Sequence, residues 1–291
     1  MTNTDAKRIL ILGVTGMLGN YLVKVLPDHF VVLAPKPNTD DVIKKIDKVN
    51  WLSSSLNVNC LKSVDSLLVE ACPDIIINCA AITPHNKMYG DYISCIRVNG
   101  LLPHYLSKTV TQIGCRLIHL STDGVFSGDR GNYKETDMPC PGDLYTRTKL
   151  IGEVTGCRCL TLRTSFFGIN HRGTGLVNWL INQVGKSIEG YKDYIFSGLS
   201  LASLARSIVH VISSCGFLTG LYHLGGPAVS KYDLLVMISR ALELNVDIRP
   251  VSGAYKNLSL DSSNFYSKTG LNIPTIDQIV EDVKLDFIQI L

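Results

Sequence analysis

Charge is scarce in this chain: Asp, Glu, Lys and Arg make up 18% of its 291 residues, and the formal net charge is +3 at pH 7. The sequence holds no long run of Lys and Arg, which a surface that follows nucleic acid phosphates requires. These absences argue against a nucleic acid partner. A hydrophobic fraction of 46% argues against disorder and is enough for a sizeable core.

Long hydrophobic runs are missing as well. No apolar run approaches the roughly 20 residues that cross a bilayer, so we expect no membrane segment. The opening stretch MTNTDAKR has no apolar run of the kind that a signal peptide needs. We therefore expect a protein of the cytoplasm.

Neither the cysteines nor the histidines show the spacing of a metal site. The nine cysteines are scattered and odd in number, and the seven histidines are dispersed. Cys157 and Cys159 form the only close pair, and a strand with alternating faces explains their spacing. This usage fits a reducing compartment and predicts no bound metal.

The sequence does contain a regular alternation of strand and helix signals. Strands are expected at residues 8–14, 29–34, 73–81, 115–123 and 158–165, and helices at 17–27, 64–72, 144–156 and within 93–114. Such an alternation predicts a parallel sheet with helices on both faces. Residues 36–56 are expected to be irregular, and residues 124–143 to form a long loop of the kind that often binds ligands.

After Ser165 the pattern changes. A glycine-rich loop at 166–175 precedes helices expected at 176–186, 201–213, 230–244 and 275–288, with strands at 220–226 and 246–251. Ser230 and Asp233 resemble a capping box, and the strand at 220–226 is expected to rejoin the main sheet. The sequence thus predicts an α/β fold: a Rossmann-type, doubly wound parallel sheet over 1–165, with returns at about 200–224, and a smaller C-terminal α/β substrate lobe over 166–291.

Three glycines, Gly13, Gly16 and Gly19, follow the first strand and open the first helix. Glycine permits a tight turn and a close approach of the backbone to a pyrophosphate, which a helix N-terminus attracts. The segment GVTGMLG therefore predicts a dinucleotide site made of Gly13, Thr15, Gly16, Met17, Leu18 and Gly19. Its spacing is GxxGxxG rather than GxGxxG, and a plain strand-to-helix turn is the alternative.

The end of the second strand indicates which dinucleotide binds. An acidic residue there would contact the ribose 2′-hydroxyl of NAD, but Lys36 stands at this point, and Asp40 and Asp41 come later. Lys36 suits a 2′-phosphate, so we expect NADP(H), with NAD(H) still open and a solvated Lys36 as the alternative.

Further cofactor contacts are expected from Asn57 near the adenine, from the small residues Cys79, Ala80 and Ala81 at a strand end, and from Asn99, which equally suits a structural role.

Tyr145 and Lys149 stand four residues apart in LYTRTK, downstream of STDGVF. A helix places such residues on one face, and an ammonium group beside a phenol lowers the pKa of the phenol. The pair is then suited to donate a proton near neutral pH, while Thr122, at a strand end, donates a hydrogen bond to a substrate oxygen. With the glycine loop, these residues predict hydride transfer to or from a carbonyl. The alternatives are a solvated Tyr–Lys pair and a Thr that caps a turn.

With these motifs in order, the chain resembles extended short-chain dehydrogenase/reductases, and more closely dTDP-4-dehydrorhamnose reductases and related nucleotide-sugar 4-ketoreductases. The resemblance rests on GVTGMLG, PDIIINCAAIT, IHLSTDGVFSG, YTRTKLIGE, LTLRTSFFG, GLYHLGG and LDSSNF, which cover nearly the whole chain. It implies that Thr122, Tyr145 and Lys149 are the catalytic set. The expected substrate contacts are Thr83, Thr122, Asp123, Gly124, Phe166 and Asn170.

Three departures from the family pattern fall in the sugar-facing region. The family usually has Tyr after STD, Trp after RTS and Tyr-Thr after the fourth strand, whereas this chain has Gly124, Phe166 and Ile82-Thr83. The identity of the sugar therefore stays open. Phe166 is suited to stack on a sugar or nucleotide ring, and a packing role between lobes is the alternative. Asp123 is followed by Gly124 rather than by an acid, which argues against a dehydratase.

The resemblance implies an NADPH-dependent reductase of the 4-keto group of a nucleotide-linked 4-keto-6-deoxy sugar, in deoxysugar or surface polysaccharide biosynthesis. Two alternatives stay open. One is a nucleotide-sugar epimerase that keeps NAD tightly bound. The other is a non-catalytic regulatory subunit, since the methionine adenosyltransferase β subunit resembles this branch. The sequence does not decide the oligomeric state, and a homodimer is one open possibility.

Overall fold

The computed structural model of the protein describes residues 6–36, 46, 48–57, 60–170, 172–213, 216, 218–253 and 255–289. Asp40 and Asp41, considered above for the cofactor, lie outside the described residues. The chain divides into two compact units. Unit 1 consists of Met1–Ser121, Asp143–Leu162 and Gly216–Leu221, and unit 2 of Thr122–Gly142, Arg163–Cys215 and Tyr222–Leu291. The assignment of substrate binding to a C-terminal lobe stays a prediction.

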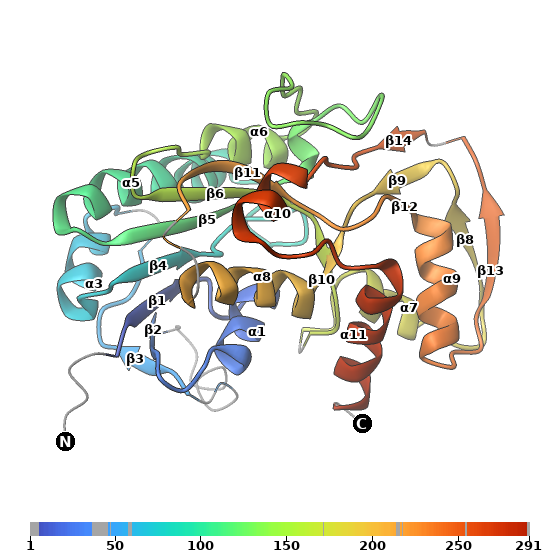
Figure 1. The fold of residues 1–291 in the computed structure, drawn as a ribbon, viewed down its shortest axis with the longest axis horizontal. Helices are drawn as coiled ribbons and strands as arrows, with labels where there is room; N and C mark the ends of the chain where they lie inside the picture. Colours follow the sequence, from blue (N-terminus) through green and yellow to red (C-terminus); the bar gives the residue numbers. More distant parts are fainter. Residues whose placement is uncertain are drawn as a thin grey trace. The chain divides into compact units, whose positions relative to one another are not determined.

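The main sheet of the described chain has seven strands in the order β11-β6-β5-β4-β1-β2-β3 (Figure 1). They are β1 (Arg8–Leu12), β2 (Val31–Pro35), β3 (Asn50–Leu52), β4 (Ile75–Asn78), β5 (Arg116–Thr122), β6 (Cys159–Thr164) and β11 (Gly220–Leu224). The pairs β1–β2, β1–β4, β2–β3 and β4–β5 are all parallel. The predicted α/β fold with a parallel sheet is confirmed, and β11 joins the sheet as expected.

The strand order changes direction beside β1. From β1 the chain order proceeds to β2 and β3 on one side and to β4, β5 and β6 on the other. In open α/β sheets, ligands bind outside the carboxyl ends of the strands at such a switch point. Leu12 and Asn78, at the ends of β1 and β4, are register partners. The glycine loop and the residues after Asn78 therefore start side by side.

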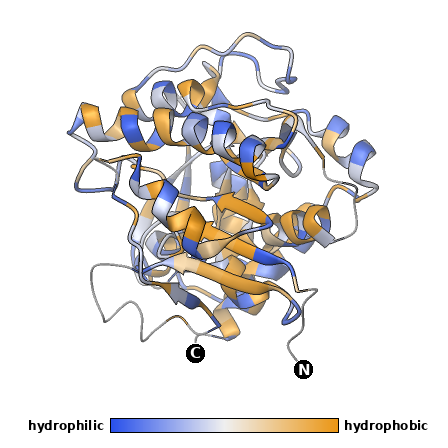
Figure 2. Cartoon of the chain, turned by 90° about the vertical axis from the view of Figure 1, so that its left-hand side faces the viewer, coloured by the Kyte–Doolittle hydropathy of each residue, from blue (hydrophilic) through white to orange (hydrophobic). Residues whose placement is uncertain are grey.

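The central strands form because their side chains are apolar on both faces, as in parallel sheets that helices cover. Ile9, Leu10, Ile11 and Leu12 are 0% exposed, and Leu10 and Leu12 belong to the apolar cluster that includes Ile76 and Leu106. Figure 2 shows the strands of the sheet as predominantly hydrophobic. None of the helices in the described parts of the chain has the length and apolarity to span a bilayer.

The helices among the described residues of unit 1 are α1 (Met17–Val25), α3 (Ser63–Ala71), α4 (Tyr92–Cys95), the π-helical segment η1 (Ile96–Leu101), α5 (Leu102–Ile113) and α6 (Leu144–Ile151). The long helix expected within 93–114 is thus interrupted. Pro103 has no N–H with which to bond the carbonyl of Asn99, its partner in a regular α-helix. A π-helical turn accommodates this missing bond.

Unit 2 holds three small sheets among its described residues. β7 (Phe166–Phe167) pairs with β10 (Leu199–Ser200), and β13 (Asp247–Val251) pairs with β8 (Ser187–Tyr191). The third sheet has the order β12-β9-β14 and consists of β12 (Val229–Ser230), β9 (Tyr194–Phe196) and β14 (Lys256–Asn257).

The helical segments in the described part of unit 2 are η2 (Asp123–Val125), α7 (Leu176–Ile181), α8 (Leu201–Ser213), α9 (Lys231–Ala241), α10 (Ser263–Thr269) and α11 (Ile276–Ile288). Ser230 caps α9 by accepting a hydrogen bond from the backbone N–H of Asp233, as expected. Thr275 and Gln278 form a capping box at α11.

Several local expectations were wrong. Residues 36–56 are not irregular throughout, since Asn50–Leu52 form β3 beside β2. The glycine-rich loop begins with a two-residue strand, β7, and the helix expected at 176–186 ends at Ile181. The two short strands pair with a neighbouring strand, β3 with β2 and β7 with β10, and a local sequence pattern does not reveal such a pairing.

Candidate active site

The glycine loop of unit 1 is sterically closed to larger residues at two positions. Gly13 has φ +82°, and a Cβ there would lie 2.7 Å from the backbone nitrogen of Ala80. A Cβ on Gly19 would lie 2.4 Å from the carbonyl oxygen of Gly13. The loop itself is held by a hydrogen bond of 2.9 Å from the N–H of Gly16 to that same oxygen. Only glycine lets the turn at Gly13 pack this closely on the residues after β4, and lets α1 pack this closely on the turn.

This turn supplies a cradle of backbone at the N-terminus of α1, of the kind that binds a dinucleotide pyrophosphate. Thr15 and Met17 are half-buried in it, and Leu18 is buried. Cys79, Ala80 and Ala81 follow β4 and are half-buried, with the N–H of Cys79 donating to the carbonyl of Leu12. Their contact with a cofactor stays a prediction, but the backbone geometry fits one.

The two residues predicted to select and hold the adenosine end are exposed. Lys36 directly follows β2, and its side chain is open to solvent. Asn57 is also exposed, and its backbone N–H donates to Oγ of Ser63 over 3.0 Å. Both positions are compatible with a bound ligand, and both roles stay predictions.

Lys149 lies buried on α6, with 2% of its surface exposed. Its Nζ donates a hydrogen bond of 2.5 Å to the carbonyl of Leu120 on β5. Burial lowers the pKa of Lys149 to about 8, against the opposing effects of Glu153 and Cys79. Burial also raises the pKa of the Cys79 thiol to about 12, so this thiol is neutral. The amine of Lys149 is therefore poised to gain or lose a proton near neutral pH.

Tyr145 stands one turn before Lys149 on α6, which begins with a capping box formed by Asp143 and Thr146. Tyr145 is half-buried, and its spacing from Lys149 puts both side chains on one face of the helix. The predicted Tyr–Lys pair therefore stands on a helix as expected. The buried position of Lys149 disagrees with the alternative of a solvated pair.

Asn99 fastens the strand end after β4 to α6. Its Oδ1 accepts from the N–H of Ile82 over 2.8 Å, and its Nδ2 donates to the carbonyl of Ile82 and to Oγ1 of Thr148, each over 3.0 Å. These bonds use the amide oxygen and both amide hydrogens. The side chain thus has a structural role, and a cofactor contact by Asn99 stays a prediction.

His119 is a residue that sequence reasoning left without a role. It lies on β5 with 0% exposure, between Asn78 on one side and Lys149 on the other. Burial and the charges of Lys149 and His104 hold the pKa of His119 well below its usual range, so the imidazole is neutral. Its signal in the sequence is a histidine inside the apolar strand IHLSTD, since a buried polar group needs partners.

Thr122 ends β5 and, within unit 2, caps the short segment η2. Its Oγ1 accepts from the N–H of Gly124 over 3.1 Å and donates to Oδ1 of Asp123 over 3.2 Å. Burial raises the pKa of Asp123 to about 6, against hydrogen bonds from Thr122, Gly124 and Ser165 and the charge of Lys256. A hydroxyl has a single hydrogen, so Thr122 must leave Asp123 in order to donate to a substrate.

A second cluster in unit 2, missed from the sequence, consists of Lys231, Tyr194 and Lys256. Lys256 on β14 is the register partner of Tyr194 on β9. Nζ of Lys231 lies 3.5 Å from the centroid of the Tyr194 ring, and Nζ of Lys256 lies 6.0 Å from it. Burial and the nearby charge of Lys256 lower the pKa of Lys231, against the opposing charge of Asp123. The two cations outnumber the one carboxylate that interacts with them, Asp123, so the cluster favours an anionic ligand.

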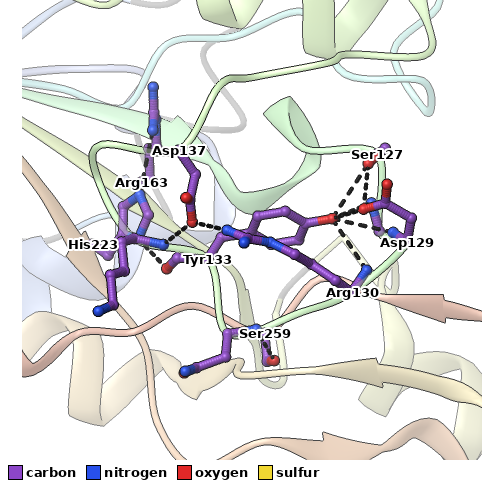
Figure 3. A network of polar contacts seen from close by, with 11 residues as sticks. Ser127, Asp129, Arg130, Tyr133, Asp137, Arg163, His223 and Ser259 are labelled. Carbon is purple, nitrogen blue, oxygen red and sulfur yellow. Dashed lines mark hydrogen bonds and ion pairs between the residues drawn. The ribbon is translucent and has the colours of Figure 1, made fainter.

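The long loop before α6 belongs to unit 2, and polar contacts of Tyr133 and His223 hold it there (Figure 3). The hydroxyl of Tyr133 accepts from the N–H groups of Gly128 and Asp129, each over 3.1 Å, and donates to Oδ1 of Asp129. The Tyr133 ring stacks on Phe126 with centroids 4.2 Å apart. Nδ1 of His223 contacts the carbonyl of Tyr133 over 2.9 Å. These contacts hold the loop that follows Thr122 in one arrangement within unit 2.

The remaining predicted substrate residues have different environments. Phe166 is half-buried, whereas Phe167 is 3% exposed and packs edge-on against Phe196. Asn170 Nδ2 donates to the carbonyl of Thr174, over 2.5 Å, and to Asn178. Its amide therefore closes its own loop. Thr83 is half-buried, and its contact with a substrate, like those of Phe166 and Asn170, stays a prediction.

Comparison with known proteins adds independent findings. A family model described as "RmlD substrate binding domain" matches residues 7–264. The dTDP-4-dehydrorhamnose reductase of Aggregatibacter actinomycetemcomitans is 30% identical over 246 residues, covering 79% of this chain and 78% of that protein. The methionine adenosyltransferase 2 subunit beta of Rattus norvegicus is 25% identical over 285 residues, covering 90% and 82%. A crystal structure of dTDP-4-dehydrorhamnose reductase from Bacillus anthracis in complex with NADP matches with a TM-score of 0.79 at 23% identity, covering 97% and 99%.

Proposed function

The chain belongs to the RmlD substrate binding domain family, and from this premise we propose that it is an NADPH-dependent reductase. Its substrate is a nucleotide-linked 4-keto-6-deoxy sugar, whose 4-keto group it reduces. The reaction belongs to deoxysugar or surface polysaccharide biosynthesis. A relative that is 30% identical over 79% of the chain is named dTDP-4-dehydrorhamnose reductase, which supports this reaction class.

The observation that carries the proposal is the environment of Lys149. A lysine is almost never fully buried without a partner or a function, and this one is anchored to the carbonyl of Leu120 one turn after Tyr145. The closed turn at Gly13 and Gly19 supports a dinucleotide close to the end of β4. Lys36, exposed after β2, supports NADPH over NADH, although NADH is also a possible donor.

When bound, NADPH would supply a hydride for reduction of the keto carbon. Tyr145 gives its hydroxyl proton to the carbonyl oxygen as negative charge develops there. The protonated Lys149 would lower the pKa of Tyr145 electrostatically and would hold the ribose of the cofactor. Thr122 turns its hydroxyl hydrogen from Asp123 to the carbonyl oxygen and so orients the substrate.

The decisive experiment incubates the purified protein with NADPH and a panel of 4-keto nucleotide sugars that differ in base and sugar, and follows the absorbance of reduced nicotinamide. We expect substrate-dependent oxidation of NADPH with at least one member. Protein that purifies with bound NAD and interconverts nucleotide sugars without net oxidation would instead be an epimerase. Protein that binds NADPH but turns over no member would favour a regulatory subunit, as the similarity to the methionine adenosyltransferase relative suggests.

We propose further that the enzyme works in the cytoplasm, where NADPH and nucleotide sugars are made, without a nucleic acid partner. A homodimer is the oligomeric state to test first, by light scattering on the eluate of a sizing column.

A further inference from the structure

We propose that His119 is a positioning residue of the reductase: Asn78 holds its imidazole in the Nε2–H tautomer, and this N–H faces Nζ of Lys149 and favours the neutral amine. The proposal rests on the catalytic role proposed for Lys149. It concerns a network inside unit 1 that connects the residues after β4 with α6.

The orientation of the Asn78 amide is fixed from its other side. The backbone N–H of Ala80 points to Oδ1 of Asn78 over 3.2 Å, and an N–H can only donate. The oxygen of the amide therefore faces Ala80, and Nδ2 faces Nδ1 of His119 over 3.2 Å. Because Nδ2 is a donor, Nδ1 of His119 must be the unprotonated acceptor.

A neutral imidazole carries one proton, so that proton lies on Nε2. Nε2 is 3.4 Å from Nζ of Lys149. A ring N–H pairs well with the lone pair of an amine but poorly with an ammonium group, which offers only donors. The imidazole therefore disfavours the charged form of Lys149, in the same direction as its burial, whereas the hydrogen bond to the carbonyl of Leu120 favours that form.

The other ionisable groups near this network leave His119 neutral. Glu153, two residues after the end of α6, favours the charged form of Lys149, and it also accepts from Oγ of Ser121 over 2.7 Å. The Cys79 thiol is neutral because burial raises its pKa to about 12. The charges of His104 and Lys149 both oppose a charged His119. His119 therefore stays neutral and keeps its single proton.

The position of His119 affects how Tyr145 regains its proton after each reaction cycle. After Tyr145 has given its proton to the substrate oxygen, its phenolate needs a proton from a neighbouring acid. An ammonium group that His119 and burial destabilise gives up its proton more readily than an ordinary lysine. The resulting amine accepts the hydrogen bond from Nε2–H, and a solvent proton then restores the ammonium form.

The first test reads the tautomer directly. Protein labelled with ¹⁵N-histidine gives imidazole signals whose shifts tell which ring nitrogen carries the proton, and His119→Gln assigns the signal. We expect a neutral His119 with the proton on Nε2. A proton on Nδ1, or a charged ring at neutral pH, would overturn the proposal. This measurement needs no substrate, so it stays valid even if the proposed reaction is wrong.

The second test reverses the tautomer. In Asn78→Asp a carboxylate accepts both from Ala80 and from Nδ1–H of His119, so Nε2 becomes an acceptor for the Lys149 ammonium. The pKa of Lys149, followed with ¹³C-labelled lysine and assigned by Lys149→Met, should rise by roughly one to two pH units, the value of a hydrogen bond to a charged group. The pH above which kcat/KM falls should increase by the same amount.

A control separates the tautomer from the added charge. The same Asn78→Asp change in a His119→Gln background keeps the carboxylate but has no imidazole to switch. We expect a clearly smaller shift of the Lys149 titration there. Equal shifts of the Lys149 pKa in the two backgrounds would mean that the added carboxylate charge alone raises it. That result would contradict the role proposed for His119. If Asn78→Asp does not fold, the tautomer of His119 in the wild-type protein still decides whether the proposal holds.

Discussion

Nζ of Lys149 on α6 and the carbonyl oxygen of Leu120 on β5 are joined by a hydrogen bond of 2.5 Å. Leu120 precedes Thr122 by two residues on the same strand. The bond therefore connects the helix that carries Tyr145 with the strand that ends in Thr122. It anchors the lysine while leaving its charge in a buried setting, where protonation is costly.

The pH dependence of the reaction should report Lys149. Its protonated form supports Tyr145, and its pKa is lowered from 10.5 to about 8. The protonated fraction is therefore nearly complete below pH 7 and falls as pH rises through about 8. We expect kcat/KM to fall by up to tenfold per pH unit above that point. A profile that stays level up to pH 10 would contradict this assignment.

Tyr145→Phe removes only the hydroxyl and keeps the half-buried ring. Loss of the general acid should lower kcat by roughly 10²–10⁴ while NADPH still binds. Steady-state turnover and a fluorescence titration of NADPH on the same preparation test both halves of this prediction. Turnover within about threefold of wild type would remove Tyr145 from the mechanism.

Lys36→Glu should weaken or reverse a preference for NADPH over NADH. A carboxylate after β2 repels the 2′-phosphate and can accept from a ribose hydroxyl. The affinities for both cofactors are measured by fluorescence, with Lys24→Glu, also exposed, as the matched control. Equal affinities in wild type, or an unchanged ratio in the Lys36 variant, would refute the role of Lys36.

Phe166 and Phe167 are neighbours on β7 with different burial, which makes them a matched pair. Phe167 is 3% exposed and contacts Phe196, so Phe167→Ala should cost roughly 3–5 kcal/mol of unfolding free energy. Phe166→Ala should instead raise KM for the nucleotide sugar with a smaller loss of stability. Thermal melting and KM are measured on both. A large stability loss with unchanged KM in Phe166→Ala would assign Phe166 to packing.

Lys231 and Lys256 are expected to bind a negative charge of the substrate, because they flank Tyr194 in a partly buried setting. Lys231→Met or Lys256→Met should raise KM for the nucleotide sugar roughly tenfold or more, the value of a hydrogen bond to a charged group. Lys268→Met, an exposed lysine on α10, is the control. Unchanged KM in both variants would contradict an anion contact.

The sequence by itself determined the features that depend on near neighbours in the chain. The glycines at 13, 16 and 19 predicted the turn because steric freedom is a property of each residue, and the structure shows how little room Gly13 and Gly19 leave. The apolar run of β4 predicted a buried parallel strand. The four-residue spacing of Tyr145 and Lys149 predicted one helix face, since helical geometry is local.

Only the tertiary structure decided which distant residues meet and what their charges do. Asn78, His119 and Lys149 lie on three different elements, so their contacts follow from strand order and helix packing rather than from spacing. Lys256 meets Tyr194 through a strand pairing across more than sixty residues. The lowered pKa of Lys149 likewise arises from burial, which depends on the whole fold of unit 1 and on no single stretch of sequence.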